Sequence, residues 1–226
     1  MQIGNARYLG AKDLPTTLPV FPLTGALLLP GAQLPLNIFE PRYLTMFDDA
    51  IAGNRIVGLV QPASGVVREG SGGVQIDDLC QVGCMGRITS FGETGDGRYL
   101  VSLTGICRFR LIEEVASAAP YRTFRTAPFL GDLDFPEDDS QVDRASLLAT
   151  FKAYLDANKL EADWESVERA SNMTLVNSMA MMSPYGPAEK QALLEAPDLK
   201  TRAETLIAIT EIVLARNFGD FDSTLQ

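Results

Sequence analysis

The sequence predicts the α+β fold class, with a β-rich pseudo-barrel followed by a C-terminal α-helical bundle. Residues 1–131 consist mainly of strand-length apolar runs separated by glycine or proline, with one helical pattern among them. From residue 140 onward the apolar residues recur at steps of three and four, which is the period of a helix. The acidic segment 132–139 lies between these patterns and is expected to be a solvated linker. We therefore predict a barrel subdomain at 1–131 and a helical bundle subdomain at 140–226.

The barrel is expected to begin within residues 18–43. Leu34, Leu36 and Ile38 alternate with polar residues or proline, as in a strand that buries one face. Pro30-Gly31 is a strong turn signal ahead of this strand. The stretch therefore predicts a strand, a turn, a second strand and then a helix.

That helix is predicted over residues 41–52. Pro41 stands at a favourable first helical position, and Gly53-Asn54 is typical of a helix end. Its apolar face comprises Tyr43, Leu44, Phe47 and Ile51. We interpret Glu40, Pro41 and Arg42 as the structural corner that joins the strand to the helix.

The remaining strands are predicted from short apolar runs. Residues 56–61 are almost continuously apolar, as expected of a strand buried on both faces. The glycine-rich segment 64–73 is interpreted as a connector, because it lacks the Gly-x-x-x-x-Gly-Lys pattern of a phosphate-binding loop. Gly105 is expected to separate two strands of the β-meander that follows. The strands of this meander are predicted at 82–91, 98–104, 107–115 and 121–129.

The second half predicts four helices, at about 140–155, 163–182, 188–195 and 197–217. Their connections are short, so we expect them to pack as a compact bundle. Each apolar stripe is too narrow to hold its helix together alone. The bundle is therefore expected to close on itself or on the barrel.

The composition limits the class of partner. The formal charge is 19 − 29 = −10, which argues against an extended basic face for nucleic acid or anionic membranes. The chain has no run of about 18 apolar residues that would predict a membrane-spanning helix. Its first residues lack the basic start and apolar run of an export signal. We expect a cytoplasmic protein with no nucleic-acid or membrane partner.

Catalytic and metal-binding patterns are weak. The chain has no histidine, which rules out Ser-His-Asp and Cys-His arrangements. Cys80 and Cys84 would stand roughly 13 Å apart on one strand, too far for one tetrahedral zinc. With Cys107, we interpret them as small buried apolar residues. A Ser-Lys dyad remains open on spacing alone, although four of the five lysines occupy polar positions of the helical half. We expect no enzyme activity, no metal and no cofactor.

Apolar residues beside the turns are the candidate contact surface. Leu27, Leu28 and Leu29 are either buried under the helices or presented as an apolar patch. The Met179–Met182 cluster resembles the composition of promiscuous peptide-binding surfaces, although filling the bundle core is the simpler interpretation. The candidate partner-binding residues are Leu27, Leu28, Leu29, Phe39, Tyr43 and Met181.

Several of these segments, taken together in this order, resemble a known domain. The segments are Leu18-Pro-Val-Phe-Pro-Leu23, Leu29-Pro-Gly31, Leu34-Pro-Leu36, Ile38-Phe-Glu-Pro-Arg-Tyr43, Ile56–Gln61, Val82–Ile88, Leu103–Arg110 and Ala188–Glu195. Over residues 14–217 the chain resembles the N-terminal LON domain of the ATP-dependent protease Lon, in the form of stand-alone bacterial LON-domain proteins. The resemblance implies a PUA-like pseudo-barrel followed by a helical bundle. It also implies a region that helps to recognise protein substrates and to assemble an oligomer.

The resemblance and the residues together give the functional hypothesis. The chain carries neither the P-loop ATPase module nor the Ser-Lys peptidase module of full-length Lon. We expect a non-catalytic protein- or peptide-binding module, an adaptor or chaperone-like factor in proteolysis whose partners are unfolded or partner proteins. Homo-oligomerisation stays open. The alternative is an enzyme or small-molecule binder with a pocket at the barrel mouth, and RNA binding conflicts with the charge of −10.

Overall fold

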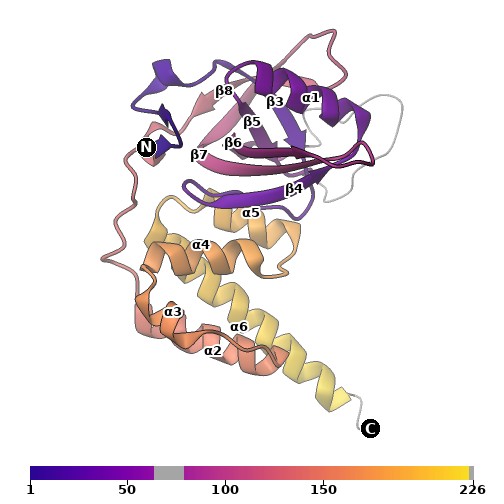
Figure 1. The fold of residues 1–226 in the computed structure, drawn as a ribbon. Coiled ribbons are helices and arrows are strands. Elements are labelled where there is room, and N and C mark those ends of the chain that lie inside the picture. Colours follow the sequence, from indigo (N-terminus) through magenta and orange to yellow (C-terminus); the bar gives the residue numbers. More distant parts are fainter. Residues whose placement is uncertain (64–78, 224–226) are drawn as a thin grey trace. The chain divides into compact units, whose positions relative to one another are not determined.

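The computed structural model describes residues 1–63 and 79–223, and side chains as far as residue 216. The chain forms two compact units, which we describe separately (Figure 1). The sheet unit comprises Met1–Pro136 and Tyr185–Leu194. The helical unit comprises Glu137–Pro184 and Glu195–Gln226. The segment 64–73, predicted as a connector, lies outside the described residues.

A six-stranded mixed sheet forms most of the sheet unit. The spatial order is β4-β7-β6-β5-β3-β8, and β7 also pairs with β8, which closes part of the sheet on itself. All pairings are antiparallel except that of β3 with β5. The strands are β3 (Thr17–Pro22), β4 (Gln33–Ile38), β5 (Ile56–Val60), β6 (Val82–Glu93), β7 (Tyr99–Val115) and β8 (Arg122–Pro128). A short hairpin of β1 (Gln2–Ile3) and β2 (Ala6–Arg7) precedes them, and α1 (Pro41–Ala52) follows β4.

The α+β class is confirmed, but one strand boundary predicted from the sequence is wrong. The structure continues one strand, β7, through Gly105, where a turn was expected. A Cβ atom at Gly105 would collide with the carbonyl oxygen of Leu29. Glycine is therefore required here for close approach of another segment and not for a turn.

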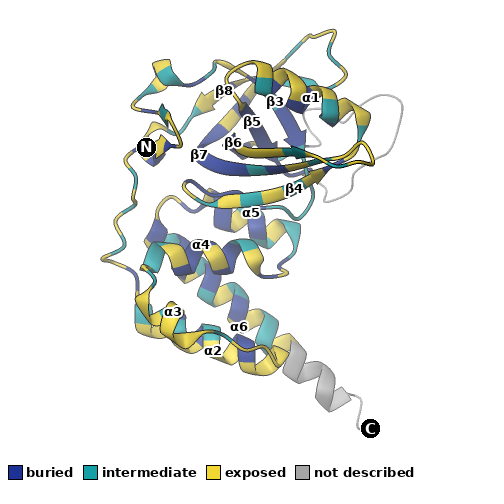
Figure 2. Cartoon of the chain, viewed as in Figure 1, coloured by how far each residue is buried: buried dark blue, intermediate teal, exposed yellow. Residues whose placement is uncertain are grey.

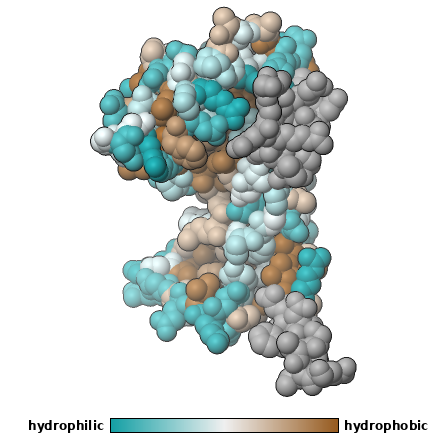
Figure 3. Space-filling view, turned by 90° about the vertical axis from the view of Figure 1, so that its right-hand side faces the viewer, coloured by the Kyte–Doolittle hydropathy of each residue, from teal (hydrophilic) through white to brown (hydrophobic). Residues whose placement is uncertain are grey.

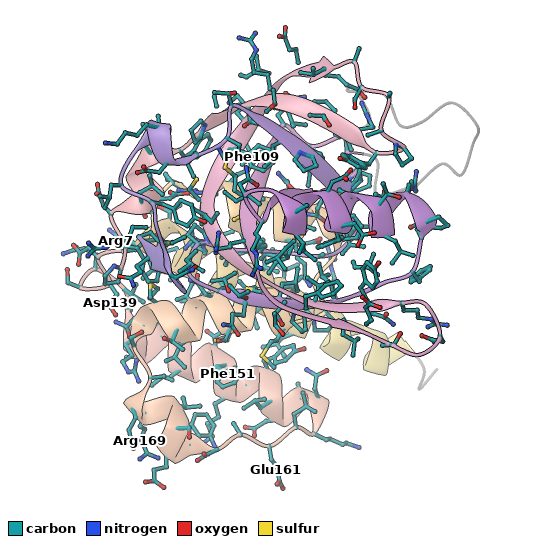
Figure 4. All side chains as sticks on the ribbon, turned by 45° about the horizontal axis from the view of Figure 1, so that its top comes forward. Arg7, Phe109, Asp139, Phe151, Glu161 and Arg169 are labelled. Carbon is teal, nitrogen blue, oxygen red and sulfur yellow. The ribbon has the colours of Figure 1, made fainter. Side chains whose placement is uncertain are left out.

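The core of the sheet unit is formed by side chains that point into the closed part of the sheet. Phe109, labelled in Figure 4, is fully buried at its centre. Figure 2 shows β5 and β7 mostly buried, whereas β4 is exposed or half-buried along most of its length. The largest fully buried apolar side chains of this unit are Leu18, Leu28, Leu29, Met46, Phe47, Met85, Leu103, Ile106, Phe109 and Phe124.

One helix predicted in the bundle belongs to the sheet unit. This helix is α5 (Pro187–Glu195). Gln61 donates a hydrogen bond to the carbonyl of Pro187 (3.0 Å), and Gln191 donates one to the carbonyl of Val82 (3.0 Å). These bonds tie the helix to the ends of β5 and β6, so the compact units divide the chain differently from the predicted boundary at 132–139.

The described residues of the helical unit form four helices, with α2 and α4 packed on α6. They are α2 (Arg144–Asn158), α3 (Trp164–Arg169), α4 (Asn172–Met182) and α6 (Leu199–Ser223). The sequence predicted one helix over 163–182, and this is wrong because Ala170 is extended and Ser171 caps a new helix. The guanidinium of Arg144 donates to the carbonyls of Val167, Glu168 and Ala170 at 2.9–3.0 Å. It thereby satisfies carbonyls that the end of α3 leaves free.

Candidate protein-binding surface

The Leu27–Leu29 segment lies inside the sheet unit. Each of its three side chains is at most 2% exposed. The segment runs so close to β7 that the Leu29 carbonyl lies against Gly105, and Gly31 donates a hydrogen bond to the Gly105 carbonyl (2.9 Å). The exposed patch that we considered for these leucines is therefore not present. Of the two interpretations left open by the sequence, burial is the one that the structure shows.

Tyr43 is also a core residue. Its ring packs edge-to-face on Phe21 at 4.5 Å between centroids, and the Arg42 guanidinium lies 4.6 Å from its centre. Burial raises the pKa of Tyr43, an effect that the charge of Arg42 partly offsets. Tyr43 thus fixes α1 to the sheet and does not belong to an exposed contact surface.

Glu40, Pro41 and Arg42 lie at the corner between β4 and α1. Nε and Nη2 of Arg42 donate to Oε2 of Glu40 at 3.0 and 2.8 Å, across the proline that begins the helix. Both side chains are more than 40% exposed, so this ion pair stabilises the corner only weakly. The geometry is that expected of a structural corner.

Phe39 is the exposed member of the predicted set in the sheet unit. Its side chain is 63% exposed and directly follows β4. Leu100, 54% exposed, lies opposite Asn37 in the β4–β7 pairing, and Phe91, 40% exposed, lies opposite Val101 in the β6–β7 pairing. Because Phe91 is paired with Val101, its side chain lies on the other face of the sheet from Leu100. Phe39 and Leu100 lie at one end of β4 and β7, and we call these two residues the distal apolar cluster.

The surface of the sheet unit is mixed in polarity. Figure 3, viewed from the side at the right of Figure 1, shows apolar surface among polar surface on the sheet unit. Sequence reasoning identified Phe39 and missed Leu100. The available signal was that Leu100 is out of phase with Val101 and Leu103, which are buried on the other face of β7. Phe91 packs edge-to-face on Tyr99 at 4.8 Å, so it is exposed on one side only.

The helical unit exposes a different methionine from the one predicted. Met181 is half-buried, whereas its neighbour Met182 is 84% exposed. Met179 and Ala180 are buried, so these two residues of the cluster fill the core of this unit. Helical phase does not explain this difference, because positions 179 and 182 share a face; Met182 is instead the last residue of α4.

The sheet unit also has a cleft of about 360 Å³, which bears on the alternative of a small-molecule binder. It lies beside Gln33 at the first residue of β4, and the hydroxyls of Thr89 and Thr104 in it hydrogen-bond to each other at 3.0 Å. Within residues 1–63 and 79–223, no group of three cysteine, aspartate or glutamate side chains is placed to hold a metal ion. Burial raises the pKa of the Cys107 thiol to about 12, which keeps it protonated and unreactive near neutral pH.

The fold and surface define a class: an α+β chain with a partly closed sheet, a separate helical unit and apolar side chains at one end of the sheet. None of the helices in the described ranges is long and apolar enough to cross a membrane. The family model of the ATP-dependent protease La (LON) substrate-binding domain matches residues 17–211. The chain belongs to this family.

Relatives and solved structures agree with this assignment. The chain is 30% identical over 210 residues to the Lon protease of Flavobacterium johnsoniae, and 25% identical over 213 residues to Lon protease 2 of Myxococcus xanthus. These matches cover 86% and 88% of the chain but only 24% of each relative, so the chain spans about a quarter of their length.

A Lon N-terminal domain protein from Xanthomonas campestris has the same fold, with a TM-score of 0.60 and 22% identity. The match covers 86% of this chain and 98% of that one. The N-terminal domain of Lon protease from the Mycobacterium avium complex gives the same TM-score at 19% identity and the same coverage of both chains. At these identities the likeness concerns the fold.

Proposed function

We propose that this chain is a non-catalytic module that binds unfolded or partner polypeptides through the distal apolar cluster, and that it acts as an adaptor or chaperone-like factor in proteolysis. The single observation that carries the proposal is the exposure of Phe39 and Leu100 within two residues of one cross-strand pair. Membership of a substrate-binding domain family supports it. The formal charge of −10 further favours polypeptides over phosphate-rich partners.

The size of the cluster suits a weak, broad interaction. Covering a half-exposed phenylalanine or leucine with an apolar partner contributes about 1 kcal/mol each. Unfolded polypeptides expose apolar side chains that folded proteins bury, so they gain most from such a surface. A Kd of about 50 µM corresponds to about 6 kcal/mol, so other contacts along the bound chain must supply the remainder.

The test uses the full chain and a permanently unfolded cation, reduced and carbamidomethylated lysozyme. Co-migration on gel filtration and fluorescence anisotropy should show binding at about 50 µM or below. The double variant Phe39→Ser with Leu100→Ser should weaken binding about tenfold or more. Absence of binding by the unaltered chain at that concentration would rule the proposal out.

A matched control removes similar apolar surface from elsewhere in the sheet unit. Ile112 and Leu130 are 46% and 45% exposed and are not part of the cluster. The double variant Ile112→Ser with Leu130→Ser should bind the probe as the unaltered chain does. Equal losses in the two double variants would show that binding is general stickiness and does not depend on the cluster.

A further inference from the structure

β4 is an edge strand. It pairs with β7 on one side, and none of the described strands pairs with its other side. Every other strand of the six-stranded sheet has at least two partners, because β8 pairs with β7 as well as with β3. In the part of the chain that the structure describes, β4 is therefore the single open edge of this sheet.

The hydrogen bonds at the start of β4 show which backbone groups face outward. Gly31, at φ +76°, donates to the Gly105 carbonyl, and Gly105 donates to the Ala32 carbonyl, both at 2.9 Å. This is a β-bulge with a left-handed glycine, which sets the phase of the ladder that follows. Alternation along an antiparallel pair then points the backbone groups of Gln33, Pro35 and Asn37 away from β7.

Proline at the central outward position agrees with this phase, because it has no N–H to donate to β7. The outward row thus offers the N–H groups of Gln33 and Asn37 and the carbonyls of Gln33, Pro35 and Asn37. No hydrogen bond joins these five groups to other residues within the described ranges.

The side chains of β4 give only part of the usual protection of an edge, because Pro35 is present but charged residues are not. Natural edge strands are commonly guarded by charged side chains, yet all six residues from Gln33 to Ile38 are uncharged. Leu34 and Leu36 point to the same face as the buried Val101 and Leu103 but remain half-exposed. They lack the cross-strand neighbour that would cover them on the open side.

We propose that β4 binds an extended polypeptide segment as an added strand. This inference rests on the proposed function and specifies its geometry. About five backbone hydrogen bonds would hold a segment of about six residues, and its apolar side chains at alternate positions would cover Leu34 and Leu36. One end of the added strand reaches the distal apolar cluster, and the other reaches the cleft beside Gln33.

The position of Pro35 argues for a foreign segment over a second copy of β4. In a two-fold antiparallel pair centred on this strand, Pro35 of each copy would lie opposite the other, and both central hydrogen bonds would be lost. A shift of two residues leaves a proline in each of two pairs and removes Asn37 from pairing. A bound segment without proline loses only the one hydrogen bond that Pro35 cannot donate. Pro35 therefore disfavours pairing of two copies of β4 and still allows β4 to pair with a foreign segment.

The test separates the backbone of the edge from its side chains. Asn37→Pro removes the second outward N–H, and Asn37→Ala keeps it while removing the same polar side chain. With reduced, carbamidomethylated lysozyme as the probe, Asn37→Pro should weaken binding about tenfold and Asn37→Ala less than about threefold. Similar binding by both variants would overturn the added-strand geometry.

Amide hydrogen exchange of the unaltered chain gives a second measurement that needs no variant. The probe should slow exchange of Gln33 and Asn37 by about tenfold or more, because both gain hydrogen-bond acceptors. Unchanged exchange at saturating probe would overturn the inference. Protection that appears without probe and rises with protein concentration would identify a second copy as the occupant and overturn it too.

The two proposals fail differently. If the Phe39→Ser, Leu100→Ser variant loses binding while Asn37→Pro binds normally, the apolar surface binds polypeptides and the edge does not. If the unaltered chain does not bind the probe, the proposed function fails, and the added strand fails with it.

Discussion

The two units each bury one arginine, but they neutralise it in different ways. In the sheet unit, Arg108 binds both oxygens of buried Asp132, at 2.7 and 2.9 Å, and donates to the Leu194 carbonyl of α5 at 3.2 Å. In the helical unit, fully buried Arg202 donates to Glu137 at 3.0 Å and to Asn177 at 3.3 Å. The carboxylate of Glu137 is 18% exposed, whereas that of Asp132 is 9% exposed.

This difference shows how each unit is held together. Asp132 also accepts the backbone N–H of Arg108 (2.8 Å), so one carboxylate joins β7 to the segment that follows β8. The sheet unit therefore contains an ion pair that water hardly reaches. In the helical unit the Glu137 side chain is more exposed, although it lies 65 positions from Arg202, and side-chain caps begin α2, α3 and α4. Loss of the buried carboxylate in the sheet unit should therefore lower the free energy of unfolding more than loss of its counterpart in the helical unit.

The largest effect is expected from Asp132→Ala. It leaves the Arg108 charge buried without its carboxylate, which should cost about 3–5 kcal/mol in the free energy of unfolding of the sheet unit. Glu137→Ala should cost less, about 1–3 kcal/mol, because water can reach the Arg202 partner site. The loss caused by Asp132→Ala is measured from hydrogen exchange of β6 and β7 amides across a series of urea concentrations. The loss caused by Glu137→Ala is measured from Trp164 fluorescence during urea unfolding.

The exposed pair of Arg125 with Glu113 provides the control. Glu113→Ala should change stability by no more than about 1 kcal/mol. Combining Asp132→Ala with Arg108→Met should restore part of the loss, because no unpaired charge then remains. A double variant less stable than Asp132→Ala alone would show that the charge is not the main cost.

Gly105→Ala should have the next largest effect. The new Cβ would collide with the Leu29 carbonyl oxygen. Because this oxygen belongs to the backbone, the collision can be relieved only if the segment around Leu29 moves. A cost of about 2–3 kcal/mol is expected, measured by the same exchange experiment. Gly92→Ala, where a Cβ meets nothing within 4 Å, is the matched control and should change stability by less than about 0.5 kcal/mol.

Gly105 also shows what the sequence could and could not predict. Alternation in β4 depends on neighbours along the chain and was predicted correctly. The apolar face of α1 was predicted in part, because Tyr43 and Phe47 are buried but the buried Met46 and Ala50 were missed. The role of Gly105 depends on Leu29, which is 76 positions earlier, so its continuous strand was missed. The same close approach buries Leu27–Leu29, and this removed most of the predicted contact surface.

The candidate site was predictable in part for the same reason. Phe39 follows a strand whose phase is visible in the sequence, so its exposure could be anticipated. The proximity of Phe39 to Leu100 depends on the register between β4 and β7. That register is set by a bulge at Gly31 and Gly105, for which single-sequence patterns give no signal.

The helical unit should respond most clearly to the loss of a helix cap. The Asp143 carboxylate accepts the Ser146 N–H at 3.1 Å at the start of α2. Asp143→Ala should cost about 1 kcal/mol in urea unfolding monitored by Trp164, whose ring packs on Phe151 of α2. Asp156→Ala, at the other end of this helix, should be neutral or slightly stabilising because it removes a negative charge near the C-terminus. Equal losses in the two variants would contradict a capping role.

The smallest expected effects concern the pH dependence of stability. The helical unit should lose stability in acid, whereas the sheet unit should also lose stability at alkaline pH. In the helical unit, hydrogen bonds from Ser146 and Ser166 lower the pKa values of Asp143 and Asp163 below 3.8. Their stabilisation is present above pH 3.8 and is lost as the pH falls through the depressed values. In the sheet unit, burial and a hydrogen bond to Asp49 raise the pKa of Tyr121 to about 12. Its stabilisation is present below pH 10 and is lost as the pH rises from 10 through about 12.

The sheet unit should therefore show an alkaline loss that the helical unit lacks. Burial raises the pKa of Tyr43 as well, which adds to the same loss. The loss of stability at low pH distinguishes the two units less well, because a hydrogen bond from Thr94 also lowers the pKa of Asp96 in the β6–β7 turn of the sheet unit. Tyr121→Phe should flatten the alkaline dependence of the sheet unit, measured by the urea midpoint of its far-UV circular dichroism between pH 9 and about 11.5. Trp164 fluorescence should keep its dependence in both proteins, and a change there instead would place the alkaline loss in the helical unit.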